Sequence, residues 1–250
     1  MRKPVIAGNW KMYHAPEDAR RFFGAFRPSW SGTQPDILIF PAAISFAAAQ
    51  SALPRRPRVQ LGVQNIHPEP HGAFTGEISA PMARAAGATH ALAGHSERRH
   101  LFGESDRDAA VRARAAADAG LVPVLCVGET LEERQAGRAG EVIIRQLDAA
   151  LAVLTPGDDV MAAYEPVWAI GTGETATPSD ASAAHGILRR RLAEAWGEER
   201  ASSVRILYGG SVNPGNAAQL LASPDIDGVL VGGASLDPDS FARIAEAAQP

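Results

Sequence analysis

The apolar positions of the chain fall into two kinds of segment that alternate along its length. The first kind is a short run of β-branched and other apolar residues without a polar face, which is typical of parallel strands buried on both sides. These predicted strands cover residues 5–10, 37–40, 59–63, 90–93, 122–127, 160–164, 205–208 and 228–231. The second kind is longer and has helical periodicity; it covers residues 16–26, 45–53, 80–86, 106–119, 141–154, 179–196, 216–221 and 240–248. Strand and helix alternating in this way predict parallel βαβ units.

Eight such units fit the length of the chain. A (β/α)8 barrel typically needs about 250 residues, and this chain has 250. No linker or low-complexity tract divides it, so we expect a single domain over residues 1–250. A doubly wound open sheet is also built from βαβ units, so the alternation alone does not decide between the two architectures.

Local signals support the helix assignments. We expect Ser179, which follows Pro178, to cap one helix and Asp106 to cap another, which would end at Gly120 in a left-handed turn. One connection is long and rich in turn residues, from Gln64 to about Ser79. Long loops in compact barrels commonly serve binding or assembly.

Composition excludes several classes of protein. The net charge is −4, and no basic stripe of the kind found in nucleic-acid-binding proteins is visible. The single cysteine, Cys126, rules out an intrachain disulfide. The first apolar run is too short for a signal peptide, and no run approaches the length of a membrane helix. We therefore expect a cytoplasmic protein without membrane or nucleic-acid partners.

The residues that follow the strands carry the candidate chemistry, because barrels place their active sites at the carboxyl ends of the strands. Asn9 and Lys11 follow the first strand on the same side of the chain, and a lysine there supplies positive charge for an anionic substrate. His95 follows the fourth strand at the start of a short helix, whose positive end disfavours the imidazolium form. Glu97 is placed either to orient Lys11 or to pair with a neighbouring arginine.

The end of the sixth strand and the segment after it predict a catalytic base followed by a loop that closes over it as a lid. Glu165 ends the strand, and an apolar stretch bounded by proline and glycine follows it. The predicted lid consists of Pro166, Val167, Trp168, Ala169, Ile170, Gly171, Thr172 and Gly173. A closing lid would remove water from the carboxylate and raise its pKa, which makes it a stronger base.

Glycine pairs follow the seventh and eighth strands: Gly209-Gly210 before Ser211, and Gly232-Gly233. The loops at these two places commonly bind phosphate in barrels through exposed backbone N–H groups. The spacing of Gly171, Gly173 and Ala176 fits a loose dinucleotide fingerprint, but Pro178 crowds the helix that should follow. His67 and His71 share a loop without thiols, so we expect no metal site and no cofactor.

Several of these segments together resemble the triosephosphate isomerase family. The matching motifs are Asn9-Trp10-Lys11-Met12, Gly72-Ala73-Phe74-Thr75-Gly76-Glu77, Gly94-His95-Ser96-Glu97-Arg98-Arg99, Tyr164-Glu165-Pro166-Val167-Trp168-Ala169-Ile170-Gly171-Thr172-Gly173, Tyr208-Gly209-Gly210-Ser211-Val212 and Val231-Gly232-Gly233-Ala234-Ser235-Leu236. They occur in the family's order and span nearly the whole chain. The resemblance implies a TIM barrel and an isomerase of glycolysis and gluconeogenesis that interconverts dihydroxyacetone phosphate and D-glyceraldehyde 3-phosphate without a cofactor.

The same resemblance implies a role for each site residue. Glu165 would transfer the proton, while His95 and Asn9 would hydrogen-bond the enediolate oxygens. Lys11, supported by Glu97, would neutralise negative charge. Backbone N–H groups would hold the phosphate, at Gly171, Ser211, Gly232 and Gly233. These roles are the family's known pattern, which is itself a standard example of pKa tuning and lid closure.

The resemblance also implies a homodimer. The loop from Gln64 to Ser79 would enter a second subunit, with Thr75 near the partner's Asn9 and Glu97. The chain departs from the family at Tyr13-His14, close to that contact, and at the start of the helix after the lid.

Other readings remain open at this stage. The first is a related isomerase of a four-carbon ketose phosphate, which would use the same chemistry in a larger pocket. The second is a non-catalytic phosphate-binding scaffold, in which one would expect the base or the electrophile to be lost. The third is a nicotinamide-dependent barrel enzyme, supported only by the loose glycine fingerprint.

Overall fold

The sheet closes on itself, because β1 pairs with β2 on one side and with β8 on the other. The computed structural model describes residues 2–30, 32–55, 57–170 and 176–248. The strands are β1 Val5–Asn9, β2 Asp36–Phe40, β3 Val59–Val63, β4 His90–Ala93, β5 Val122–Val127, β6 Met161–Tyr164, β7 Arg205–Tyr208 and β8 Gly228–Val231. All eight neighbouring pairs are parallel. The predicted barrel is confirmed, and closure excludes the doubly wound alternative.

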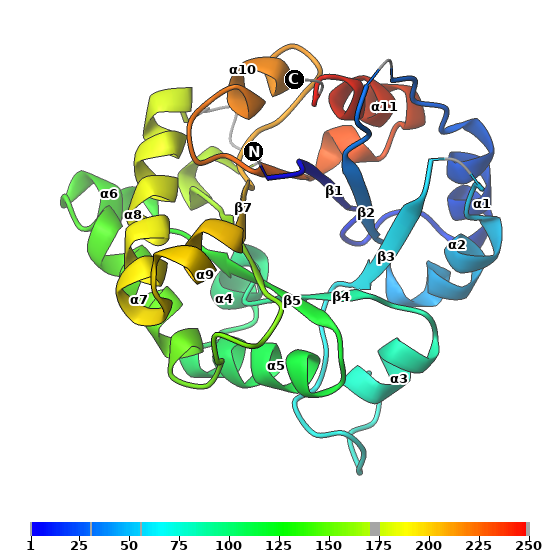
Figure 1. Cartoon of the computed structure of the whole chain (residues 1–250). Coiled ribbons are helices and arrows are strands. Elements are labelled where there is room, and N and C mark those ends of the chain that lie inside the picture. Colours follow the sequence, from blue (N-terminus) through cyan, green and yellow to red (C-terminus); the bar gives the residue numbers. More distant parts are fainter. Residues whose placement is uncertain (1, 31, 56, 171–175, 249–250) are drawn as a thin grey trace.

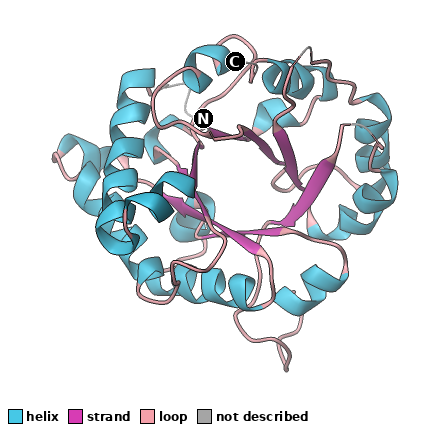
Figure 2. Ribbon diagram, viewed as in Figure 1, coloured by secondary structure: helices cyan, strands magenta, loops and turns pink. Residues whose placement is uncertain are grey.

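Helices surround the barrel on its outer side (Figure 1; Figure 2). The α-helices are α1 Pro16–Ala25, α2 Phe46–Ala52, α3 Ala80–Ala85, α4 Ser96–Leu101, α5 Asp106–Asp118, α6 Leu131–Gln135, α7 Ala139–Leu151, α8 Pro178–Trp196, α9 Glu198–Ser203, α10 Ala217–Leu221 and α11 Pro238–Glu246. Short 3-10 turns add η1 Ala43–Ser45, η2 Val167–Ala169 and η3 Gly233–Ser235. None of the described helices is long and apolar enough to cross a membrane.

The two predicted caps were wrong by one or two residues. Thr177, not Ser179, caps α8, and its side chain accepts from the backbone N–H of Asp180. Ser105, not Asp106, caps α5, with Asp108 in the reciprocal position of the capping box. Gly120 has φ 73°, as predicted for a left-handed turn after the helix.

Side chains along each strand point alternately into the barrel and out toward the helices, which gives the protein two apolar cores. Residues that point into the barrel form a cluster of Val5, Ala7, Leu38, Phe40, Leu92, Val124, Cys126, Met161, Ala163, Leu207 and Leu230. Neighbouring residues such as Ile6, Ile37 and Ile39 point outward and pack against the helices. Gly62 makes room inside the barrel, because a Cβ there would lie 2.3 Å from the Phe40 ring.

The same alternation places the chemistry at one end of the barrel. Met161 and Ala163 face the interior, so Glu165 continues on the inward side just beyond the end of β6. By the same count Asn9 follows Val5 and Ala7 along β1. The register of the sheet therefore brings these side chains to the mouth of the barrel.

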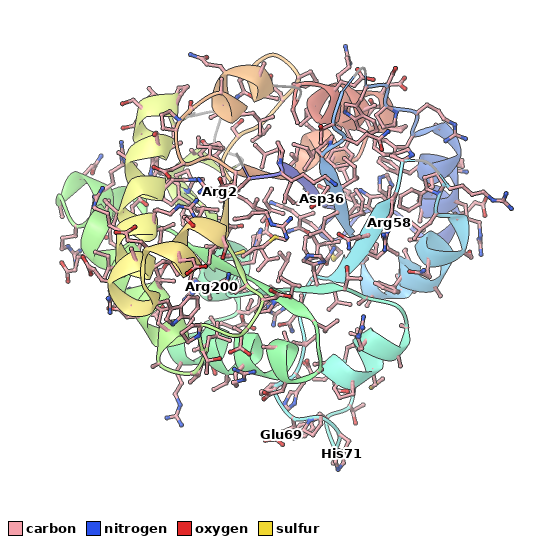
Figure 3. All side chains as sticks on the ribbon, in the orientation of Figure 1. Arg2, Asp36, Arg58, Glu69, His71 and Arg200 are labelled. Carbon is pink, nitrogen blue, oxygen red and sulfur yellow. The ribbon has the colours of Figure 1, made fainter. Side chains whose placement is uncertain are left out.

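The loop between β3 and α3 stands outside the ring of helices, with Glu69 and His71 at its tip (Figure 3). Its base is closed by a hydrogen bond of 2.8 Å from the His67 N–H to the Ile78 carbonyl. The His67 and Phe74 rings pack against each other in a tilted arrangement, with centroids 3.8 Å apart and an angle of 31° between the planes. The loop is thus an ordered projection, and it exposes its tip.

Two buried histidines make the fold sensitive to acid. Burial lowers the pKa of His90 and of His185 to about 4 each. His185 bonds the Asp225 carbonyl through Nδ1, and its Nε2 has no partner in the described part of the chain. Both rings are therefore neutral in the folded protein at neutral pH.

We expect the free energy of unfolding to fall as pH drops from 6.5 toward 4. A histidine whose folded pKa lies below its unfolded value of about 6.5 stabilises the fold above that pH and loses the contribution below it. Each ring should account for a loss of about 2 kcal/mol by pH 5. Urea unfolding at fixed protein concentration measures the slope. His71→Gln, at the exposed loop tip, is the control and should leave the slope unchanged; a wild-type slope of zero contradicts the expectation.

Candidate active site

The predicted site residues line one cavity at the mouth of the barrel. The cavity holds about 270 Å³, at the small end of the range for ligand pockets. Its lining includes Asn9, Lys11, His95, Glu165, Ile170, Ser211, Leu230, Gly232 and Gly233. Glu97 lies behind Lys11 rather than on this cavity. Gly171, Thr172 and Gly173 lie outside the described residues.

Lys11 is held in an unusual backbone conformation. Its φ is 50°, which is uncommon for a residue with a Cβ and costs on the order of 1–3 kcal/mol. The Lys11 N–H donates to the Asn9 side chain at 3.0 Å, and Gln64 donates to the Lys11 carbonyl at 2.8 Å. The Lys11 ammonium lies 2.6 Å from a carboxylate oxygen of Glu97. Backbone and side chain are therefore both fixed, and Glu97 pairs with Lys11 rather than with an arginine.

His95 is oriented by the start of α4. The backbone N–H of Glu97 donates to Nδ1 of His95 at 3.3 Å, so this nitrogen accepts and carries no hydrogen. Nε2 then carries the hydrogen and points to Glu165 Oε1, 3.0 Å away. Burial disfavours the imidazolium, but the Glu165 carboxylate outweighs it and raises the pKa of His95 above its ordinary value. The hydrogen bond from the Glu97 N–H opposes protonation of the His95 ring, because Nδ1 can accept this bond only while it carries no hydrogen.

Glu165 is fully enclosed yet ionised. Burial acts to raise its pKa, but the His95 ring and the Ser96 N–H, which donates at 2.7 Å, bring the pKa below its ordinary value. The sequence argument concerned the carboxylate beneath a closed lid, where loss of water would raise the pKa, and burial acts in that direction here as well. In this arrangement the carboxylate is a ready acceptor of protons, and its basicity rises once it leaves the Ser96 N–H.

The opposite wall of the cavity comes from the loops after β7 and β8. The η3 turn begins at Gly233, and the Ser235 hydroxyl donates to the Gly232 carbonyl at 2.7 Å. The Trp10 indole donates to the Ser235 carbonyl at 3.1 Å, which ties this turn to the segment that carries Lys11. A Cβ on Gly232 would lie 3.5 Å from Lys11 Cε, so the lysine side chain passes close to this glycine. Positive charge and small backbone residues thus face the same space, as an anion site requires.

The first half of the predicted lid is anchored at its base. Trp168, in η2, donates from its indole to Glu129 Oε1 at 2.9 Å. Glu129 is fully buried and also accepts from the Tyr164 hydroxyl at 3.0 Å. The Arg134 guanidinium covers the Trp168 ring at 4.6 Å. Ile170, at the far end of this half, reaches the cavity lining.

Sequence reasoning missed several residues of this neighbourhood. Ser96 contributes its backbone N–H to Glu165, and Gln64 supports the Lys11 backbone. Neither has a pattern that would reveal such a role. Glu129 follows β5, so it could have been found from sequence by the rule that barrel active sites lie at the carboxyl ends of the strands. Among the described residues no group of three or more histidine, cysteine, aspartate and glutamate side chains is arranged to hold a metal ion.

Comparison with known proteins agrees with this geometry. The family model described as triosephosphate isomerase matches residues 4–248. The chain belongs to the triosephosphate isomerase family. A curated relative named triosephosphate isomerase from Symbiobacterium thermophilum is 52% identical over 99% of this chain and 98% of its own length. Relatives of the same name from Solibacter usitatus and Thermus thermophilus are 49% and 46% identical, over 98% and 96% of this chain and 99% and 97% of theirs.

Membership of the triosephosphate isomerase family identifies the chain as an isomerase and decides among the open readings. Full-length relatives carrying this name favour the three-carbon reading over an isomerase of a four-carbon sugar. The nicotinamide and scaffold readings have no comparable support. Gly171 and Gly173 of the loose glycine fingerprint lie outside the described part of the chain, and Ala176 is a buried residue within it.

We expect Trp168→Phe to lower kcat/KM about tenfold. The change removes one hydrogen bond to a buried carboxylate, worth about 1.5–3 kcal/mol, and so weakens the anchored state of the lid. Steady-state kinetics measure the effect. Trp30→Phe is the matched control, because that indole bonds the Ala245 carbonyl away from the site. An unchanged kcat/KM for Trp168→Phe contradicts the anchoring role.

Proposed function

We propose that the protein interconverts dihydroxyacetone phosphate and D-glyceraldehyde 3-phosphate as a triosephosphate isomerase of glycolysis and gluconeogenesis. One observation carries the proposal: an ionised Glu165 and the hydrogen-bearing Nε2 of His95 lie 3.0 Å apart in a cavity that also holds Lys11 and two glycine turns. An acid–base pair on one side and an anion site on the other suit a small phosphorylated sugar. The small volume of the cavity supports the same substrate class.

The proposed reaction moves one proton between neighbouring carbons. Glu165 takes a proton from the carbon beside the carbonyl, and the C–H electrons form the enediolate while the carbonyl electrons move to oxygen. The Nε2–H of His95 and the Asn9 side chain stabilise the oxygens, and the Lys11 ammonium neutralises developing charge. Glu165, now protonated, returns the proton to the adjacent carbon. Nε2 of His95 gives its proton to the former carbonyl oxygen and takes one from the neighbouring hydroxyl, whose oxygen becomes the new carbonyl.

The phosphate is assigned to the opposite wall. Backbone N–H groups of Ser211, Gly232 and Gly233 come from loops at the ends of β7 and β8, where barrels commonly bind phosphate. Gly171, which lies outside the described residues, completes the proposed set. The lid segment, residues 166–173, would close over the substrate, exclude water and protect the enediolate from losing phosphate.

We further propose a homodimer of single-domain subunits in the cytoplasm. Pairing of β1 with β8 joins the two ends of the chain in one sheet, which supports a single domain over residues 1–250. Met12 is 94% exposed, and Leu101 and Phe102 are exposed beside it in a second cavity that reaches Lys11 and Glu97. Large exposed apolar side chains at a hollow favour a protein interface. The projecting loop of a second copy, with Thr75, would fill it.

We expect the purified protein to isomerise glyceraldehyde 3-phosphate in a coupled assay, with or without chelator. A kcat/KM approaching roughly 10⁸ M⁻¹s⁻¹ is expected from the family, for which diffusion-limited turnover is the standard behaviour. Glu165→Asp keeps the charge but withdraws the carboxylate by one methylene, and should lower kcat about a hundredfold or more. Glu132→Asp, on α6, is the control. No activity, or full activity of Glu165→Asp, contradicts the proposal.

We expect Thr75→Arg to yield monomers with greatly reduced kcat. A long cation in the proposed interface cavity would meet Arg98, which lines it, and block docking of the loop. Sedimentation and kinetics on the same sample measure both effects. Glu198→Arg, exposed at the start of α9, is the matched control. A fully active monomer contradicts the dimer requirement.

A further inference from the structure

The segment that follows β5 fixes the backbone of the proposed base. The Glu165 N–H donates to the Val127 carbonyl at 2.8 Å, and the Val167 N–H donates to the Glu129 carbonyl at 3.1 Å. Residues 127–129 thus extend the pairing of β5 and β6 past the ends of both strands. The position of Glu165 and of the first lid residues depends on where this segment lies.

Gly128 is the point of closest approach between the two segments. A Cβ at this position would lie 1.8 Å from the Glu165 carbonyl oxygen and 2.6 Å from its carbon. The two peptide groups are therefore in direct contact, without a side chain between them. A shift of Gly128 toward Glu165 would therefore displace the Glu165 backbone.

Gln146 holds the Gly128 residue from the helix side. It lies on α7 and is 5% exposed. The Gly128 N–H donates to Gln146 Oε1 at 2.7 Å, and Gln146 Nε2 donates to the Gly128 carbonyl at 3.2 Å. Both bonds are buried. One side-chain amide thereby satisfies both polar groups of one residue and fixes its orientation.

The neighbours of Gln146 on α7 make its role distinct. Val142, Ile143, Leu147 and Ala150 are the other buried residues of this helix, and all are apolar. A buried amide adds no apolar contact area beyond what a methionine of similar length would give. Its particular contribution is the pair of hydrogen bonds to Gly128.

We infer that Gln146 is a positioning residue for the isomerase reaction, which acts through Gly128 on the placement of Glu165. The inference rests on the proposed function. Gln146 is not among the described residues that line the substrate cavity, and its side-chain amide bonds Gly128, on the β5 side of the barrel. Its loss should therefore slow proton transfer and leave phosphate binding unchanged.

The first test compares Gln146→Met with Leu147→Ala. Gln146→Met keeps the length of the side chain and removes both hydrogen bonds, whereas Leu147→Ala opens a cavity in the adjacent apolar core. We expect Gln146→Met to lower kcat at least about tenfold, because small misplacements of a base are costly. KM and inhibition by inorganic phosphate should stay within about twofold of the wild type, since binding of the phosphate is separate from proton transfer. Leu147→Ala should lower the melting temperature while kcat stays near wild type.

The second test uses Gln146→Glu, which restores the bonds in one protonation state. A protonated carboxyl group can accept from the Gly128 N–H and donate to its carbonyl, but a carboxylate would face the carbonyl with a lone pair. Burial raises the pKa of such a carboxyl. We expect the ratio of its kcat to the wild-type kcat to be highest at pH 6, above that of Gln146→Met, and to fall as the new carboxyl ionises. The fall of this ratio with rising pH needs only the wild type and Gln146→Glu, so it tests the inference even where Gln146→Met does not fold, and a ratio that does not change with pH overturns it.

The outcomes separate the inference from the function on which it rests. An active wild type together with an unchanged kcat in Gln146→Met overturns the positioning role alone. The same conclusion follows if Gln146→Glu at pH 6 is no more active than Gln146→Met, or if Leu147→Ala loses kcat to the same extent. A wild type without isomerase activity overturns the proposed function, and the inference falls with it.

Discussion

Strands β1 and β8 come from opposite ends of the chain, and their pairing is the contact on which the site depends. Val5 to Gly8 pair in register with Gly228 to Val231. The approach is close enough that a Cβ at Gly228 would lie 2.0 Å from the Val5 carbonyl oxygen. Closure brings Lys11, just after β1, alongside Gly232, just after β8. Without this pairing the cation and the glycine turns that form the anion site would lie at separate edges of an open sheet.

The charges in the site are arranged in two pairs that share one small volume. Lys11 is paired with Glu97, and Glu165 faces His95. Glu97 also contributes its backbone N–H to His95, so a single residue supports both pairs. A bound phosphorylated sugar would affect both pairs at once. Its negative charge would attract the Lys11 ammonium, and its oxygens would compete with Glu165 for the Nε2–H of His95.

The barrel, its strands and the cavity lining could be predicted from sequence, because each rests on a repeated local pattern. Apolar runs marked the strands, and the rule that barrel sites lie at strand ends located Lys11, His95 and Glu165. The caps were missed because serine, threonine and aspartate compete for neighbouring positions, and the backbone geometry that chose Thr177 and Ser105 has no signature of its own. The lowered pKa of Glu165 in this arrangement could not be predicted for a different reason. Burial was foreseeable, whereas the contacts with the Ser96 N–H and the His95 ring depend on how β4 and β6 are placed across the barrel.

The support behind Glu165 shows why the base needs a firm backbone. Its carboxylate is bound to Ser96 and His95 in this structure, so the proposed proton transfer would require the side chain to rotate toward the substrate. A side chain that rotates delivers its oxygen reliably only from a fixed Cα. The pairing of residues 127–129 with Glu165 and Val167, backed by Gln146, supplies that fixed point. Glu129 extends the same support to Trp168, so one short segment after β5 anchors both the proposed base and the start of the segment proposed to cover it.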